Sequence, residues 1–119
     1  PMTLKECYDR MHGNYDDAKS RLMMESMVER FMFKFLEDGT MAALRAAVEA
    51  GNIPDSFREA HTLKGVAANL AFTELQAAAS QLTEQLRPQT APADPELFAR
   101  VEDAYKLVID SIHAYQSEK

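Results

Sequence analysis

The residues of this chain best suited to chemistry are His61, Lys64 and Gly65, which lie within one short stretch of sequence. Neutral imidazole is a competent nucleophile near physiological pH. Residues three and four positions apart are neighbours on a helix, so Lys64 and Gly65 would lie one turn from His61. If a helix presents them to solvent, a nucleophile, a positive charge and a position without a side chain lie side by side.

A helix through this stretch would bury one face and expose His61 on the other. At 100° per residue, the predicted buried stripe consists of Leu63, Val66, Ala67 and Leu70, with Ala60 at its edge. The opposite face carries His61, Gly65, Ala68 and Phe72, with Phe57 and Lys64 at its margin. An exposed face normally carries long polar residues, and Gly within a helix costs about 1 kcal/mol relative to Ala. We infer that a bulky partner approaches His61 closely and that Gly65 leaves room for it.

The elements that must position this face are all predicted to be helical. Glycines at 13, 39 and 51 are typical helix ends, while Thr40, a Thr73–Gln76 capping box and Pro95 are typical helix starts. Together these signals predict helices at about 3–12, 16–37, 41–50, 55–71, 73–87 and 95–116. No strand-like alternation or repeat interrupts them. The expected fold is all-α, an antiparallel bundle of four main helices with one or two additional short helices.

The predicted helix over residues 16–37 is apolar over most of its circumference. One stripe, which is expected to pack in the core, contains Met23, Met24, Met27, Phe31 and Phe35, and a second side contains Leu22, Met32, Phe33 and Leu36. The short N-terminal helix could cover the second side. Alternatively, part of this surface docks a partner, since Met and Phe suit adaptable apolar interfaces. The two interpretations are compatible.

Composition restricts the class of protein. A chain of 119 residues, 46% hydrophobic and 27% charged, is expected to form one globular domain over residues 1–119. A net charge of −6 argues against nucleic-acid binding, and no apolar run approaches the roughly 20 residues of a membrane span. Cys7 is the only cysteine, which excludes an internal disulfide and favours a reducing, cytoplasmic location. We expect a monomer.

Other chemistry has little support in the sequence. His12 and His113 are distant from His61 and form no metal-binding pair on a helix, so no metal site is expected. Both are expected to be surface residues or to make helix-cap contacts, and Cys7 is expected to pack as a small apolar residue. No phosphate-binding glycine loop or nucleophile elbow is present. Nothing in the sequence indicates a self-contained active site.

The stretch Ala60-His61-Thr62-Leu63-Lys64-Gly65-x-Ala67-x-x-Leu70 resembles the histidine-containing phosphotransfer (HPt) domains of two-component phosphorelays. These domains are four-helix bundles of about this size, so the resemblance covers most of the chain. By this resemblance His61 matches the phospho-accepting histidine, and Lys64 and Gly65 match the lysine and glycine that follow it. Two positions differ from the family pattern: Ala71 replaces a common glycine, and Thr83 stands where several members carry a glutamine near the phosphoryl group.

The resemblance implies a phosphocarrier without turnover of its own. One imidazole nitrogen, Nε2 by analogy with the family, would accept the phosphoryl group from a receiver-domain aspartate or a histidine kinase, while Lys64 neutralises the phosphoryl oxygens. The chain needs no cofactor, because Mg²⁺ is expected on the receiver domain. Phe57, Ala68 and Phe72, with part of the second helix, are expected to form the docking surface.

Two other functions agree with the same residues. The chain could be the phospho-accepting substrate domain of a larger hybrid or chemotaxis-type histidine kinase, which keeps the chemistry and changes its context. It could also be a passive helical interaction module, in which His61 and Gly65 have no chemical role. A passive interaction module would not be phosphorylated by any partner, whereas a phosphocarrier or a kinase substrate domain would be.

Overall fold

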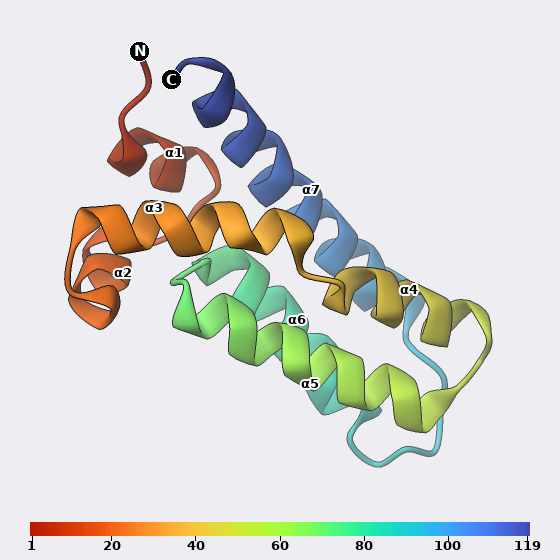
Figure 1. The fold of residues 1–119 in the computed structure, drawn as a ribbon. Helices are drawn as coiled ribbons and strands as arrows, with labels where there is room; N and C mark the ends of the chain where they lie inside the picture. The colour runs from red at the N-terminus through yellow and green to blue at the C-terminus, as the bar shows by residue number, and fades with distance from the viewer.

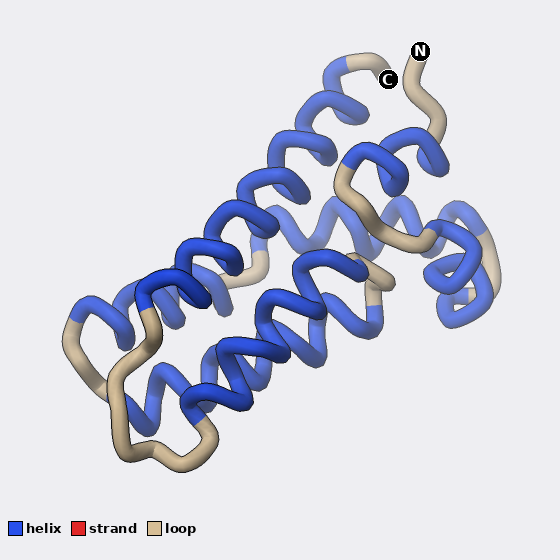
Figure 2. Tube along the Cα trace, turned by 180° about the vertical axis from the view of Figure 1, so that it is seen from behind, coloured by secondary structure: helices blue, strands red, loops and turns tan.

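The computed structural model describes residues 1–119 and consists of helices joined by short turns and one longer loop (Figures 1 and 2). The elements are α1 (Leu4–Arg10), α2 (Tyr15–Leu22), α3 (Glu25–Lys34), the 3₁₀ turn η1 (Phe35–Glu37), α4 (Thr40–Glu49), α5 (Ile53–Asn69), α6 (Thr73–Leu86) and α7 (Pro95–Ser117). The predicted all-α class is confirmed. No helix is both long enough and apolar enough to cross a membrane.

Helices α4, α5, α6 and α7 form an antiparallel four-helix bundle, as predicted. Each packs against the next along the chain. Arg45 of α4 also contacts α7, the last helix of the bundle. Its Nε lies 2.9 Å from the Glu102 carboxylate, and its guanidinium lies 5.4 Å from the centre of the Tyr105 ring. Buried leucines, alanines and valines from all four helices fill the space between them.

Three short helices, rather than one or two, pack at the end of the molecule where α7 extends beyond its bundle partners (Figure 1). Helix α1 lies against α7, and the buried Cys7 thiol donates to the carbonyl of Ser111 at 3.4 Å. Helix α3 also reaches α7, where the rings of Phe33 and Tyr115 lie 6.0 Å apart. Both termini of the chain lie at this end.

The prediction of one helix over residues 16–37 is wrong, because the chain breaks at Met23 and Met24. Met23 has a φ of 78°, which ends α2, and α3 then folds back against α2. The two methionines at this corner are 81% and 54% exposed, so they do not belong to the core stripe assigned to them. On α3 and η1 the buried positions are Val28, Met32 and Phe35. Met32 packs beneath α1, 3.8 Å from the Cys7 sulfur, so the N-terminal helix does cover part of the second side.

Helix α5 begins earlier than predicted. The Asn52 side chain accepts a hydrogen bond from the backbone N–H of Asp55 at 3.0 Å, and Pro54 occupies the first turn. The start at Asp55 or Ser56 was therefore placed too late. Two other predicted caps are also wrong. Gly39, rather than Thr40, is the N-cap of α4, and the N–H of Thr40 donates to the Asp38 carboxylate at 2.8 Å. Helix α6 begins without a side-chain cap at Thr73.

Helix α5 ends at Asn69, two residues before the predicted end, and α1 fixes this end. The buried Tyr8 hydroxyl donates to the carbonyl of Leu70 at 2.8 Å, and the N–H of Asn14 donates to the carbonyl of Ala71 at 2.9 Å. Ala71 adopts a φ of 57°, a conformation that glycine tolerates best. This turn reverses the chain into α6 and sets the end of the helix that carries His61.

Candidate functional site

His61 lies on the outer face of α5, in the second half of the helix, as the sequence predicted. Ala60, Leu63 and Ala67 are fully buried against the bundle, while His61, Thr62 and Gly65 are exposed. The predicted buried stripe is confirmed except at Val66, which is only half-buried. The bundle therefore holds the backbone of α5 while leaving the imidazole accessible.

The imidazole of His61 rests on an aromatic neighbour. The rings of Phe57 and His61, one turn apart on α5, have centroids 6.1 Å apart and planes inclined by 23°. Phe57 is itself half-buried. A partly buried ring restricts the rotamers of the side chain stacked on it, so Phe57 orients the nucleophilic candidate without blocking it.

Lys64 and Gly65 occupy the turn after His61. Lys64 is half-buried and forms no ion pair with any carboxylate of the chain, so its ammonium is free to meet an incoming anion. A Cβ added at Gly65 would have no atom within 4 Å. The glycine is therefore not required by packing inside this chain, which fits the idea that it leaves space for something outside. Ala68, one further turn along, is half-buried.

Helix α6 contributes two charged side chains that the sequence analysis did not identify. Arg87 donates three hydrogen bonds to the Glu84 carboxylate, at 3.1, 3.2 and 2.8 Å. The Arg87 guanidinium also lies 5.3 Å from the centre of the Phe57 ring. These hydrogen bonds lower the pKa of Glu84 against the opposing effect of desolvation, and electrostatic interactions with Arg87, Lys64 and His61 lower it further. The Glu84–Arg87 pair thus borders the site, and only the packing of α6 on α5 reveals it.

Thr83 does not lie in the phosphoryl neighbourhood, contrary to the analogy. It is fully buried, and its hydroxyl donates to the carbonyl of Ala79 at 2.7 Å. A hydroxyl that is buried and already paired within its own helix cannot contact a group on the exposed face of α5. Glu84, the next residue, is the one that faces outward.

Phe72 is not part of an exposed docking surface. It is 1% exposed, and its ring packs against Tyr8 at 5.7 Å and Phe35 at 5.2 Å. The prediction assumed that α5 continued through this residue. The left-handed turn at Ala71 instead directs the Phe72 side chain into the core. Of the three predicted docking residues, only Phe57 and Ala68 remain partly accessible.

The remaining candidates lie away from His61. His12 and His113 are exposed, in the turn after α1 and on α7, and Cys7 is buried in the core. Burial raises the pKa of the Cys7 thiol to about 11, which makes it a poor nucleophile at neutral pH. No group of three or more His, Cys, Asp or Glu side chains is arranged to hold a metal ion.

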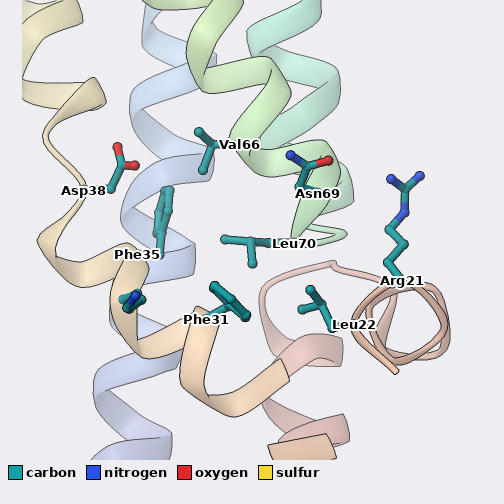
Figure 3. A pocket seen from close by; sticks show the side chains of 9 residues that line it. Arg21, Leu22, Phe31, Phe35, Asp38, Val66, Asn69 and Leu70 are labelled. Atoms are coloured by element: carbon teal, nitrogen blue, oxygen red, sulfur yellow. The ribbon is translucent and has the colours of Figure 1, made fainter. Parts of the chain in front are cut away.

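An apolar groove of about 430 Å³ opens near the C-terminal end of α5 (Figure 3). Its walls are formed by Leu22 of α2, Phe31 of α3, Val66 of α5 and Leu70, the C-cap residue of α5, and Lys34 is among its polar residues. Leu22 and Phe31 belong to the segment that the sequence predicted as a possible docking surface. His61 does not line the groove, but both His61 and the groove residue Val66 belong to α5.

The fold and the site together define a helical bundle that presents a histidine on the outer face of a central helix. The model of the Hpt domain family matches residues 26–111, which extend from α3 through most of α7, and the chain belongs to this family. Hpt domains are phosphocarrier modules of histidine phosphotransfer in two-component signalling, and they interact with receiver domains and kinases. Comparisons with curated proteins and with solved structures gave no match.

Proposed function

We propose that this protein carries a phosphoryl group on His61, exchanging it with receiver-domain aspartates or taking it from a histidine kinase. One observation carries the assignment of the residue. The chain has three histidines, and only His61 lies within the matched residues 26–111. It is also the histidine that stacks on Phe57 beside the unpaired Lys64 and the open position at Gly65.

The transfer step needs only groups that this face supplies and a phosphorylated partner. A lone pair on one ring nitrogen, Nε2 by analogy, attacks phosphorus as the bond from phosphorus to the receiver's aspartate oxygen breaks. The carboxylate leaves with the bonding electrons, and Nδ1 keeps its proton. Lys64 then neutralises part of the charge on the phosphoryl oxygens. The receiver domain would supply Mg²⁺ and the phosphorylated aspartate.

Docking would centre on the outer face of α5. Phe57 and Ala68 offer partly buried apolar surface, and Gly65 between them allows close approach. The exposed Met23 and Met24 form the corner between α2 and α3 and follow Leu22, which lines the groove. We propose that a monomer of this protein docks one receiver domain here, in the cytoplasm.

Phosphorylation assays test the proposal directly. The protein is incubated with a panel of phosphorylated receiver domains, and any phosphate acquired is tested for acid lability and located by mass spectrometry. We expect acid-labile label on His61, lost in His61→Gln and retained in His12→Gln and His113→Gln. His61 is exposed, so its replacement should change the free energy of unfolding by less than about 0.5 kcal/mol.

Two outcomes would contradict the proposal. Label that persists in a folded His61→Gln variant would assign the chemistry to another residue. The absence of label with every receiver and kinase tested would favour a passive helical interaction module.

A further inference from the structure

Arg87 of the Glu84–Arg87 pair and His61 both lie against the ring of Phe57. The guanidinium of Arg87 lies over the Phe57 ring, and the same ring stacks with the imidazole of His61. Glu84 is hydrogen-bonded to Arg87 at 2.8 Å, and electrostatic interactions with Lys64 and His61 contribute to the lowered pKa of its carboxyl group. A carboxylate and a guanidinium of opposite charge therefore stand together at the edge of the site.

The ion pair between Arg87 and Glu84 is weak enough for another anion to replace Glu84. The side chains of Arg87 and Glu84 are 50% and 58% exposed, and solvent screens ion pairs of this kind. A phosphoryl group on His61 would add about two negative charges close by. The guanidinium fork binds phosphate oxygens in the same bidentate manner as a carboxylate, so the new anion competes with Glu84 for Arg87.

On the basis of the function proposed above, we propose that Arg87 exchanges Glu84 for the phosphoryl group, so that this pair sets how strongly the carrier holds phosphate on His61. Glu84 raises the free energy of the phosphorylated state by repulsion and by competing for Arg87. Arg87 lowers it by attraction. Both are positioning residues that act on charge, since no covalent bond to either one forms or breaks.

The two members of the pair should have opposite effects on the transfer equilibrium. Glu84→Gln removes the repulsion and releases Arg87, so the equilibrium with a receiver aspartate should shift several-fold toward phosphorylated His61. Arg87→Gln leaves Glu84 unpaired and should shift the same equilibrium several-fold toward the phosphorylated receiver aspartate. The double variant should lie between them, and all shifts should shrink at high salt. The equilibrium constant refers to the free proteins, so altered docking affinity does not contribute.

A second measurement needs no partner protein. In a His12→Gln, His113→Gln background, phosphoramidate phosphorylates His61 chemically, and ³¹P NMR follows the second proton of the phosphoryl group. A nearby cation stabilises the dianion and a nearby anion destabilises it. The pKa of the phosphoryl group should therefore rise in Arg87→Gln and fall in Glu84→Gln. Arg87→Lys should retain part of the wild-type value.

A matched ion pair on α7 serves as the control. Arg100 and Glu96 form a similarly exposed ion pair, with an N–O distance of 2.9 Å, outside the site. Arg100→Gln and Glu96→Gln should therefore match the wild type in both assays. Unchanged equilibria and phosphoryl pKa values in both Glu84→Gln and Arg87→Gln would overturn this inference. Shifts of the same sign in the two variants would also overturn it. Failure of every receiver to exchange phosphate, with the NMR shifts still present, would instead overturn the proposed function.

Discussion

The Tyr8 hydroxyl on α1 donates a 2.8 Å hydrogen bond to the carbonyl of Leu70, the residue that caps α5. Tyr8 lies outside residues 26–111, the part that matches the family. An element outside the matched region thus holds the end of the helix that carries His61. The bond is buried, so its loss leaves a carbonyl without a partner.

We expect Tyr8→Phe to lower the free energy of unfolding by about 1–2 kcal/mol, because the buried Leu70 carbonyl loses its donor. Urea unfolding measures the effect. Tyr105→Phe is the matched control, since the Tyr105 hydroxyl forms no hydrogen bond within the chain, and it should change the free energy of unfolding by less than about 0.5 kcal/mol. Equal values for the two variants would show that the hydrogen bond does not stabilise the end of α5.

Phe57 should affect transfer more than stability. Phe57→Leu keeps an apolar side chain at a half-buried position but removes the ring on which His61 stacks. We expect several-fold slower phosphoryl transfer, with a stability loss of about 1 kcal/mol. Phe98→Leu, at a half-buried position on α7, controls for the loss of an aromatic ring. Wild-type transfer rates in Phe57→Leu would rule out an orienting role for this ring.

Gly65 should matter for docking and not for folding. A methyl group at this position meets open space, so Gly65→Ala should be neutral or stabilise the protein by up to about 1 kcal/mol through helix propensity. Gly65→Gln adds a long side chain beside His61 and should slow transfer from a receiver. Transfer rates and urea unfolding are measured for both variants. The steric explanation is wrong if Gly65→Gln accepts phosphate as fast as the wild type.

Lys64 should act on the phosphoryl group and not on the fold. It is half-buried without an ion pair, so Lys64→Ala should change the free energy of unfolding by less than about 0.5 kcal/mol. Its ammonium becomes more effective when a docked receiver excludes water, so we expect several-fold slower transfer. Lys64→Arg keeps the charge and should largely preserve the rate. A time course that is identical for Lys64→Ala and the wild type would remove electrostatics from the proposed mechanism.

The positions of Phe72 and Thr83 show where reasoning from one helix fails. Helical periodicity predicts that α5 continues through Ala71, but that residue adopts a left-handed conformation, and Phe72 packs in the core against Tyr8 and Phe35. The family pattern places Thr83 near the phosphoryl group. The direction of the Thr83 side chain depends on how α6 is rotated against the neighbouring helices. In the structure this rotation buries Thr83 and exposes Glu84.

The all-α class, most of the helices and the exposed face of His61 could be predicted from residue patterns. These features depend on the periodicity of apolar residues and on turn signals a few positions apart, which are local properties. The break at Met23, the contact of α1 with the end of α5, and the Glu84–Arg87 pair beside Phe57 could be found only in the folded chain. Those features arise from packing between segments distant in sequence, and no local pattern specifies how two helices rotate and approach one another.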